Sequence, residues 1–499
     1  MDSLPAIISG LKAKGRKLVH CHGVFDLLHV GHIRYFEAAK KMGDILVVTV
    51  TPDRFVNKGP GRPAFAEHLR AEGISSLSCV DYVSINKWPT AVEAIRLLKP
   101  DLYVKGSEYK NPEADVSGGI VLEKKAVREA GGELAFTDEI TFSSSELINH
   151  NLPIHSPQIR KYLDGFSKRH KVQDVLRYLN GAQSMRVLIV GETIVDEYQY
   201  CQTMGKSGKE PILAAKLQKC EKFAGGVLAV ANHVGTVTEK IKLVSFLGQR
   251  SSHEEFIEEK LNPAVERHFL RLEEGPTIVK RRFVESYPFQ KLFEVYEMHG
   301  DEYRPGESKA LCDKLKEVLP LVDVVIVTDY GHGMIGPEAV ELLCREAPFL
   351  AINTQVNAGN RGYNTVSKYS RADFICVSEQ EIRLEVRNRL ESLNDIVEKI
   401  SKSMACDNIL ITRGEKGSLG FNSRDGFFEI PAFRSNTVDR VGAGDAVFGL
   451  TSLCVAQNAP MEMVGYIGNV VGAQAVGTVC NRDSIDKVQL LKSITHMLK

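Results

Sequence analysis

The sequence predicts two α/β domains in one chain: a doubly wound, parallel-sheet domain at the N-terminus and a larger α/β domain at the C-terminus. Its 499 residues exceed the usual size of one domain. Short β-rich runs alternate with helical patterns in both halves, which is typical of parallel sheets covered by helices. Between residues 156 and 181 this alternation gives way to two short amphipathic helical patterns, which predict a helical connection.

The first domain shows five strand-like runs between residues 18 and 140. These runs are KLVHC, DILVVTV, DYVSI, DLYVKG and ELAFTDEI, and the helical patterns between them include AVEAIRLLK and GIVLEKKAVREAGG. Ser156-Pro157 then signals a helix start, and apolar residues follow at helical spacing. We therefore place the first domain at residues 1–150 and a helical linker at residues 151–184.

The second domain, residues 185–499, begins with the run MRVLIVGETIVDEY. Further strands are predicted at KIKLVSFLG, VDVVIVTDY, FLAINT, ADFICVS and DNILITRG. The α/β pattern continues to the end of the chain without a visible repeat.

Composition excludes several classes of protein. Lys+Arg and Asp+Glu both number 63, so no net field favours nucleic acid or an anionic membrane. No run approaches the ~18 apolar residues of a membrane helix. The ten cysteines include no CxxC pair, which is typical of reduced thiols in a cytosolic protein. We expect a cytoplasmic protein that acts on small molecules, without nucleic-acid or membrane partners.

A first candidate site follows the first strand, where KLVHC runs into HGVFDLLHVGH. His29 and His32 fall where a strand meets a helix N-terminus, and backbone N–H groups and the helix dipole favour phosphate there. Two imidazoles at such a place can both donate to a triphosphate as charge develops, and Gly31 lets the backbone approach closely. The HxGH tetrapeptide alone fits a structural pair of histidines equally well.

Three further motifs follow in order: KGPGRP at residues 58–63, VKGSEY at 104–109 and FSSS at 142–145. Together with the HxGH segment they resemble the cytidylyltransferase-like nucleotidyltransferase family over about residues 15–150, which implies a Rossmann-like fold.

The resemblance implies roles for individual residues. His29 and His32 would contact the triphosphate, Lys105 would stabilise phosphate charge, and Arg62 would approach the second substrate or the closing loop. Asp26 either orients this loop or touches substrate. The nucleotide, ATP or CTP with Mg²⁺, would lie beside Gly23, Phe25, Gly31, Ser143, Ser144 and Ser145.

A second candidate site lies near the C-terminus, in the run NTVDRVGAGDAVF. Gly442 and Gly444 permit a tight turn whose amides form an anion hole for a transferring phosphoryl group. Asp445 begins the following helix and can accept the proton of a substrate hydroxyl that attacks a γ-phosphate. Taken alone, an Asp at this place is first of all a helix N-cap.

Four motifs precede this run: VGETIVD at residues 190–196, AGG at 224–226, TDYGHG at 328–333 and TRGEKG at 412–417. The ordered set resembles the ribokinase (PfkB-type) sugar-kinase family over about residues 185–499, which implies a ribokinase-like α/β domain with a small β lid.

This second resemblance also implies roles. Asp445 would be the catalytic base, Glu381 would organise Mg²⁺, and a monovalent cation can lie near the anion hole. The anion hole would be formed by Gly442, Ala443 and Gly444, the sugar hydroxyls would be held by Asp196, Gly225 and Gly226, and ATP would be flanked by Thr412, Gly414 and Gly417.

Residues 203–219 and 277–285 read as exposed strands, which in this family form a lid that also pairs protomers. We therefore expect a homo-oligomer, such as a dimer, held through the lid. Lys280, Arg281 and Arg282 either meet a phosphate already on the sugar or form an ordinary basic edge strand.

Three positions depart from the sugar-kinase pattern. Ala229 stands where the helix after the paired glycines normally offers an Asn, Ser378 stands where an Asn often precedes the Glu, and Arg440 replaces a usual Thr. The departures alter the sugar contacts and leave the phosphoryl-transfer centre intact.

A sugar kinase joined to a nucleotidyltransferase resembles the bifunctional heptose-phosphate kinase/heptose-1-phosphate adenylyltransferases, with the domain order reversed. The chemistry would be consecutive: the kinase phosphorylates O1 of a sugar, such as a heptose phosphate, and the transferase makes an ADP-heptose-like NDP-sugar and pyrophosphate. One alternative is a CTP-dependent cytidylyltransferase/kinase for another sugar or polyol phosphate. Another is a regulatory, sugar-binding kinase half with only the transferase active.

Overall fold

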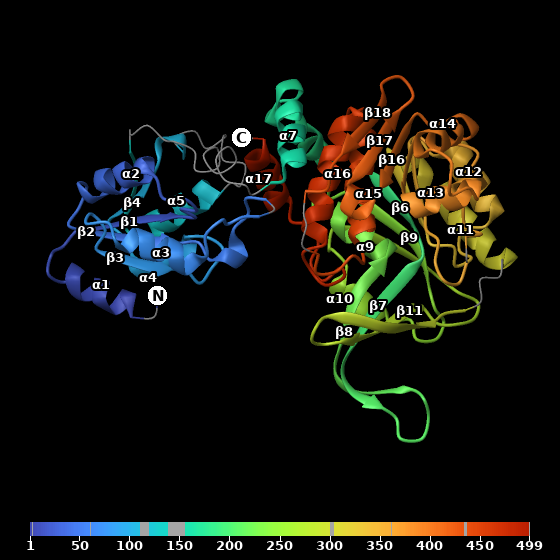
Figure 1. Cartoon of the computed structure of the whole chain (residues 1–499), viewed down its shortest axis with the longest axis horizontal. Coiled ribbons are helices and arrows are strands. Elements are labelled where there is room, and N and C mark those ends of the chain that lie inside the picture. Colours follow the sequence, from blue (N-terminus) through green and yellow to red (C-terminus); the bar gives the residue numbers. More distant parts are fainter. Residues whose placement is uncertain are drawn as a thin grey trace. The chain divides into compact units, whose positions relative to one another are not determined.

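The computed structural model describes residues 1, 3–59, 61–109, 119–137, 155–299, 304–360, 362–433 and 437–498. They form two compact units (Figure 1): Met1–Arg169 together with Val488–Lys499, and His170–Lys487. The first unit is therefore built from both ends of the chain. The first crossing between units falls inside the predicted linker, while the boundaries 1–150, 151–184 and 185–499 stay a prediction.

The first unit contains a five-stranded sheet in the order β3-β2-β1-β4-β5, with parallel pairing throughout. The predicted doubly wound sheet and its five strands are confirmed. The strand order reverses between β1 and β4, and ligands bind at such a switch point in open α/β sheets. The unit comprises α1 (Leu4–Lys12), β1 (Leu18–Gly23), α2 (Val30–Lys40), β2 (Ile45–Val50), α3 (Glu67–Ser75), β3 (Tyr82–Ile85), α4 (Val92–Leu98), β4 (Leu102–Lys105), α5 (Gly119–Glu129), β5 (Glu133–Phe136), α7 (Pro157–Arg169) and, at its C-terminal end, α17 (Lys487–Met497).

The second unit contains a nine-stranded sheet in the order β10-β9-β6-β13-β14-β15-β16-β17-β18. Its first seven strands are parallel, and β17 and β18 add antiparallel pairs at one edge. The strands are β6 (Val187–Gly191), β9 (Ile241–Leu247), β10 (Val265–Arg271), β13 (Val324–Asp329), β14 (Leu350–Thr354), β15 (Phe374–Ser378), β16 (Asn408–Thr412), β17 (Ser418–Asn422) and β18 (Gly426–Ile430). The helices are α8 (Val172–Gly181), α9 (Val227–Val234), α10 (Glu254–Lys260), α11 (Pro305–Val318), α12 (Pro337–Glu346), α13 (Glu379–Val386), α14 (Leu393–Ser403), α15 (Ala443–Val455) and α16 (Met461–Ala475).

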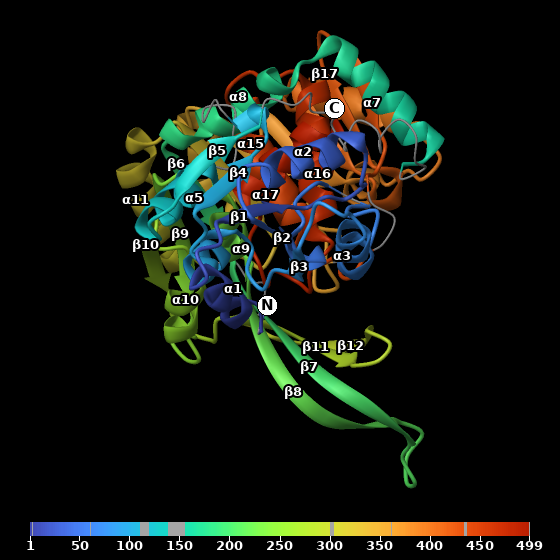
Figure 2. The ribbon, with the colours of Figure 1, turned by 90° about the vertical axis from the view of Figure 1, so that its left-hand side faces the viewer.

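A second, four-stranded sheet of this unit has the order β12-β11-β7-β8 and forms the predicted lid. Its strands are β7 (Thr193–Lys206), β8 (Leu213–Gly226), β11 (Ile278–Glu285) and β12 (Gln290–Glu297). The β7–β8 hairpin projects far beyond the body of the unit (Figure 2). Sequence reasoning anticipated strands in 203–219 and 277–285 but missed β12, whose run QKLFEVYE mixes charged and apolar residues.

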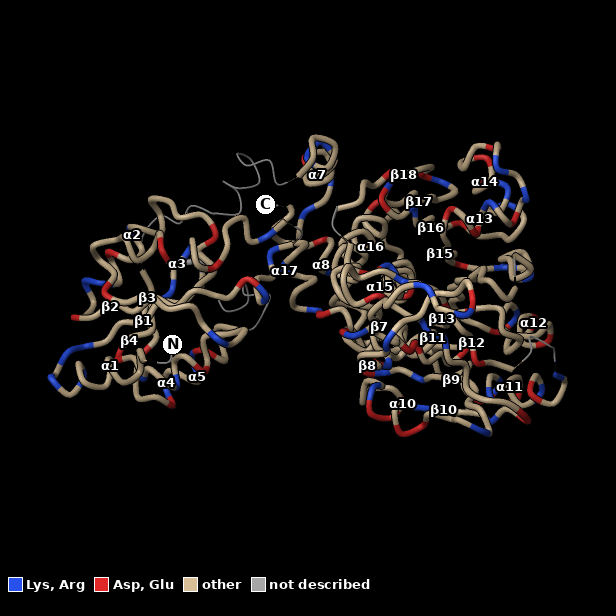
Figure 3. Tube along the Cα trace, turned by 60° about the horizontal axis from the view of Figure 1, so that its bottom comes forward, with Lys and Arg blue, Asp and Glu red and all other residues tan. Residues whose placement is uncertain are grey.

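The burial of the central strands and the distribution of charged residues agree with what the sequence predicts. The central strands β6 and β13 are buried along their whole length, as expected for parallel strands covered on both faces. Basic and acidic residues are interspersed along the chain (Figure 3), in agreement with the zero formal net charge. Among the described residues, none of the helices has the length and apolar character needed to span a bilayer.

Candidate active sites

The GAGD turn opens α15 at the carboxyl edge of the nine-stranded sheet. Gly442 is the N-cap, with φ of 84°, and a Cβ there would lie 1.8 Å from the Asn481 side-chain oxygen. Only glycine therefore fits this position. The first turn of a helix leaves its backbone N–H groups without intrahelical acceptors, so the N-terminus of α15 can bind an anion, as predicted for the transferring phosphoryl group.

Asp445 lies in that first turn with its carboxylate buried. Its Oδ1 accepts hydrogen bonds from the Tyr330 hydroxyl (2.9 Å) and the Gln355 Nε2 (3.2 Å). Burial raises the pKa of Asp445 to about 7, and the nearby carboxylate of Asp196 acts in the same direction. A carboxylate with such a pKa is suited to general-base catalysis near neutral pH.

Two cavities meet at this turn. One has a volume of about 310 Å³ and contains Asp445. The other, about 230 Å³, has a more apolar lining that includes Phe433 and Val447. Both are lined by Thr412, Arg440 and Gly444. An acceptor and a phosphoryl donor bound in these cavities would approach each other at the anion-binding turn and Asp445.

The larger cavity receives charged side chains from the lid. Lys280 and Arg282 alternate with Arg281 along β11, so the first two line the cavity while Arg281 pairs with Glu197 on the other face of the lid sheet. Arg282 forms ion pairs with Asp196 and Glu294. The Lys280 ammonium lies 5.4 Å and 5.8 Å from the ring centroids of Tyr296 and Tyr330.

The paired glycines at the end of β8 make room for Asp196. A Cβ on Gly225 would lie 2.0 Å from Asp196 Oδ2, so Gly225 supports this carboxylate from behind. Gly226 has φ of 57° and lines the cavity itself. The predicted sugar-binding set is thus brought together, with Arg282 as an additional partner of Asp196.

Glu381 also lines the larger cavity and closes a capping box at the start of α13. Its Oε2 accepts from the Ser378 N–H (2.7 Å), while the Ser378 hydroxyl accepts from the Glu381 N–H. Burial raises the pKa of Glu381. Ser378, a departure from the family pattern, therefore serves as the helix cap. No group of three or more metal-ligating side chains occurs in the described part of the chain.

The smaller cavity contains the second set of predicted residues. Thr412, Gly414, Gly417, Ala443 and Gly444 all line it. Gly417 has φ of 85°, and a Cβ there would lie 2.0 Å from the Ile430 carbonyl oxygen. A largely apolar pocket with a few polar groups suits a nucleotide base.

In the first unit, the predicted histidines come together at the start of α2. Their rings stack with centroids 4.0 Å apart. His29 is the N-cap, and its Nδ1 accepts from the Gly31 N–H (3.1 Å), which assigns the proton of the neutral ring to Nε2. Burial and Lys58 lower the pKa of His29, and burial and His29 lower the pKa of His32 to about 3. Both rings are neutral at physiological pH, and each offers one N–H.

Gly23 and Phe25 shape the loop below this pair. Phe25 is buried, adopts φ of 48°, and presents its ring edge-on to His32 with centroids 5.3 Å apart. A Cβ on Gly23 would lie 2.8 Å from the Phe25 ring. Phe25 therefore supports the histidine from the core, and its place beside the nucleotide stays a prediction.

Asp26 and Arg62 form a buried ion pair with 2.6 Å between Oδ2 and Nη1. The other carboxylate oxygen accepts from the N–H groups of Ala64 (2.7 Å) and Phe65 (3.3 Å). Of the two alternatives for Asp26, the structure thus favours orienting the loop. Arg62 is held on this loop by the same carboxylate.

Lys105 ends β4 on the sheet edge where β1 ends, because Cys21 and Val104 are paired in register. Its ammonium forms an ion pair with Glu123 of α5 at 2.9 Å, which sequence reasoning missed because the two residues lie on separate elements. Ser143, Ser144 and Ser145 lie outside the described residues.

The fold and these two sites define an α/β phosphotransferase with a second, nucleotide-binding α/β unit. The chain belongs to the pfkB family of carbohydrate kinases, whose model matches residues 184–487. Residues 20–150 match the cytidylyltransferase-like family. Both resemblances inferred from sequence motifs are thereby confirmed, as is the order of the two domains.

Several relatives are proteins named Bifunctional protein HldE. The chain is 37% identical to that of Syntrophotalea carbinolica over 139 residues (28% of this chain, 27% of that protein). It is 42% identical to that of Trichlorobacter lovleyi over 122 residues (24% and 25%). A longer match, 24% identical over 325 residues, is to that of Actinobacillus pleuropneumoniae (64% and 66%). The chain thus matches only about a quarter of the length of the first two relatives.

Among solved structures, phosphofructokinase-2 from Escherichia coli in complex with potassium superposes with a TM-score of 0.51 at 14% identity. The match covers 63% of this chain and 100% of that chain. This similarity shows the fold of the second unit.

Replacing the buried carboxylate tests its assigned role. Asp445→Asn should lower the kinase rate ~10²–10⁴-fold, because the amide keeps the shape but cannot take a proton. In the unchanged protein, kcat should rise with pH with a midpoint near 7, since the base acts only when ionised. Steady-state rates of both proteins, measured at a series of pH values around 7, check the loss of rate and the pH dependence. Undiminished turnover of the variant would remove Asp445 from the mechanism.

Asp445→Asn should also be more stable against unfolding than the unchanged protein in alkaline solution. The folded state holds the Asp445 proton more tightly than the unfolded chain, so ionisation destabilises the fold as pH rises from 3.8 to about 7. The melting temperature of Asp445→Asn should therefore exceed that of the unchanged protein above neutral pH. Nucleotidyl transfer from supplied sugar 1-phosphate is the control and should be intact.

The histidine pair makes a separate prediction. His29→Ala or His32→Ala should lower kcat for nucleotidyl transfer ~10²–10³-fold and leave KM for the nucleotide nearly unchanged, because the interaction is made mainly in the transition state. Kinase activity is the internal control. A lower melting temperature with normal turnover per folded molecule would instead show that the rings only hold the loop.

Proposed function

We propose that the chain is a bifunctional cytoplasmic enzyme that makes an NDP-activated sugar. The second unit would use ATP to phosphorylate O1 of a sugar, and heptose phosphates are the sugars to test first. The first unit would transfer a nucleotidyl group from ATP or CTP to the sugar 1-phosphate and release pyrophosphate. The similarity to proteins named Bifunctional protein HldE supports this pairing of activities.

The observation that carries the kinase activity is the meeting of the two cavities at Asp445 and the N-terminus of α15. Asp445 takes the proton of the sugar hydroxyl. The oxygen of that hydroxyl then attacks the γ-phosphorus of ATP, while the bond between the γ-phosphorus and the leaving ADP breaks. The N–H groups of the Gly442–Gly444 turn stabilise the transferring group.

The surroundings of Asp445 fit a cation-assisted reaction. Mg²⁺, when bound, neutralises phosphate charge, and Glu381, whose carboxylate oxygens are oriented by backbone N–H groups, would hold it. A monovalent cation near the anion hole is a further proposal, which the complex of phosphofructokinase-2 with potassium supports.

Lys280 is the residue of the larger cavity that favours an anionic sugar. Arg282 is committed to two carboxylates, whereas none of the described side chains forms an ion pair with Lys280. Lys280 is only 7% exposed, and burial lowers its pKa. Asp196, Glu192 and Asp445 attract the Lys280 ammonium without forming an ion pair with it. A phosphate on the sugar would add a charge-assisted contact, so we propose a sugar phosphate as acceptor.

The nucleotidyl transfer would use the neutral histidine pair. His29 and His32 donate to the triphosphate as charge develops on the leaving pyrophosphate, while the phosphate of the sugar attacks the α-phosphorus. The Lys105 ammonium, which forms an ion pair with Glu123, would also contact the phosphates and add positive charge there.

Product analysis tests the whole proposal. The protein is incubated with ATP, CTP and either a panel of heptose phosphates or a supplied sugar 1-phosphate, and products are identified by mass spectrometry. We expect a sugar bisphosphate from the heptose phosphates and an NDP-sugar from the sugar 1-phosphate. Lys280→Met should raise KM for the phosphorylated sugar ~10-fold or more, because a charge-assisted contact is lost.

The matched control is Arg281→Met, which removes a neighbouring charge from the opposite face of β11 and should not change this KM. Equal KM values for Lys280→Met and the unchanged protein would contradict the sugar-phosphate assignment. CTP consumption instead of ATP consumption in the transfer step would decide the nucleotide.

We also propose that two copies associate through the lid. The face opposite Lys280 carries Phe283 and Phe293, whose rings stack with centroids 4.5 Å apart, beside Val295. Phe293 is 54% exposed and Val295 44% exposed. Apolar residues on a projecting sheet favour burial against a second copy.

Light scattering during gel filtration checks the assembly. The unchanged protein should have twice the chain mass of 55.3 kDa, and Phe293→Glu should shift it to the monomer because a charge would be buried at the interface. Tyr287→Glu is the control, since Tyr287 is 91% exposed in the β11–β12 turn. A monomeric unchanged protein would contradict the proposal.

A further inference from the structure

Tyr330 contacts the catalytic base directly. It follows β13, its ring is buried, and its hydroxyl donates to Asp445 Oδ1 at 2.9 Å. Gln355, which follows the neighbouring strand β14, donates to the same oxygen at 3.2 Å. Oδ1 therefore has two donors, whereas Oδ2 has no protein partner among the described residues.

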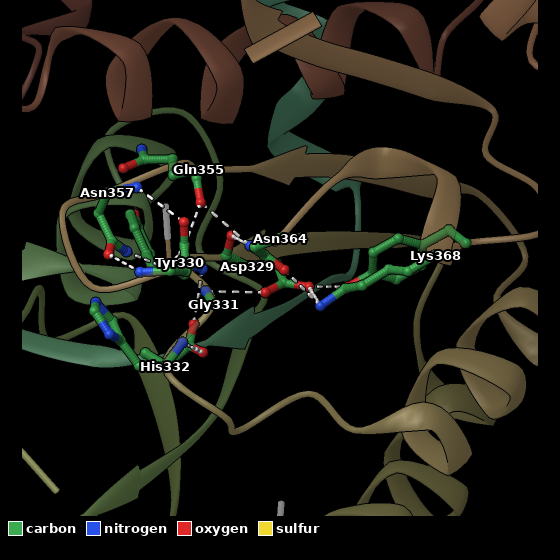
Figure 4. Close-up of polar contacts among 11 residues, drawn as sticks. Asp329, Tyr330, Gly331, His332, Gln355, Asn357, Asn364 and Lys368 are labelled. Carbon is green, nitrogen blue, oxygen red and sulfur yellow. Dashed lines mark hydrogen bonds and ion pairs between the residues drawn. The ribbon is translucent and has the colours of Figure 1, made fainter. Parts of the chain in front are cut away.

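The backbone of Tyr330 is held on both sides (Figure 4). Its carbonyl accepts from the side-chain amides of Asn357 (2.7 Å) and Asn360 (3.2 Å). Its N–H donates to Glu192 Oε2 at 3.0 Å, and the His332 N–H donates to the other oxygen of Glu192 at 3.1 Å. A buried network that is this well satisfied allows little movement of the loop.

The same network holds Gln355. Its carbonyl accepts from the amides of Asn360 (3.0 Å) and Asn364 (3.3 Å), and Asn364 also donates to the Asp329 carbonyl at 2.8 Å. The Asp329 carboxylate is in turn bound by Lys368 and by the Tyr369 hydroxyl. Both donors to Asp445 are thus carried by one rigid assembly of loops.

The environment of Asp445 explains why such donors are needed. Asp196 of β7 and Glu381 of α13 oppose its ionisation electrostatically, as does burial, while Lys280 of β11 favours it. A hydrogen bond to the charged form offsets part of this effect. It also restricts the rotation of the carboxylate.

We propose that Tyr330 is a positioning residue for the phosphoryl transfer, which with Gln355 holds Asp445 Oδ1 so that Oδ2 alone receives the proton of the sugar hydroxyl. This inference rests on the kinase activity proposed above. It assigns a role to the tyrosine of the TDYGHG motif, for which sequence reasoning had none.

A double-mutant cycle in the full chain tests the inference. Tyr330→Phe should lower the kinase kcat ~10- to 100-fold, the effect of losing a hydrogen bond to a charged group. KM for ATP and for the sugar should change less than ~2-fold, because the tyrosine acts on the base. In an Asp445→Asn background the same change should have almost no further effect, since there is no base left to position.

Ser308→Ala is the control. It also removes a buried hydroxyl from a carboxylate, that of Glu338, and neither residue lines the larger cavity. We expect a lower melting temperature for it, with kcat per folded molecule close to that of the unchanged protein.

The outcomes separate the two levels of the proposal. An unchanged protein without kinase activity on the sugar panel would overturn the proposed function. An active protein whose Tyr330→Phe variant has unaltered kcat, or loses activity equally in the Asp445→Asn background, would overturn this inference alone. Gln355→Met should also lower kcat without changing KM, by a smaller factor than Tyr330→Phe. An unaltered kcat of Gln355→Met would contradict the role given to Gln355.

Discussion

A carboxylate buried at a helix N-terminus is the constraint around which the second unit is arranged. In the role proposed for it, Asp445 must ionise to accept a proton, yet burial and the carboxylates of Asp196 and Glu381 oppose its charge. The helix dipole of α15, the Lys280 ammonium and the Tyr330 hydroxyl all favour the ionised form. The lid strand β11 carries Lys280, and the loops after β13 and β14 carry Tyr330 and Gln355, so these groups converge on the carboxylate of Asp445.

The lid is connected to the anion-binding turn through Asp439. Its carboxylate accepts from the Tyr198 hydroxyl of β7 (2.6 Å) and from Lys291 of β12 (2.6 Å). It also accepts from the N–H groups of Val441 and Cys480, which shapes the turn before Gly442. The lid therefore contributes to the proposed reaction centre in two ways: it supplies Lys280 and Arg282, and it holds the loop that precedes α15.

The two units use the same backbone device with different side chains. In each, a strand leads to a helix N-terminus whose N–H groups can face phosphate. The first unit adds two neutral imidazoles, since its proposed reaction needs donors toward a leaving pyrophosphate. The second adds a carboxylate with a raised pKa, since a sugar hydroxyl must lose a proton before it attacks.

The sequence by itself determined the families of the two domains, their order and the position of each helix-start turn, because the motifs that show them are local: a glycine turn, a helix start and the hydrophobic period of a strand lie within a few residues. The tertiary structure alone decided the partners across elements. It paired Arg282 with Asp196, Lys105 with Glu123 and Tyr330 with Asp445, and it put Phe25 in the core. These contacts join residues 18 to 115 positions apart, and strand order and register, which no short motif encodes, determine which of them meet.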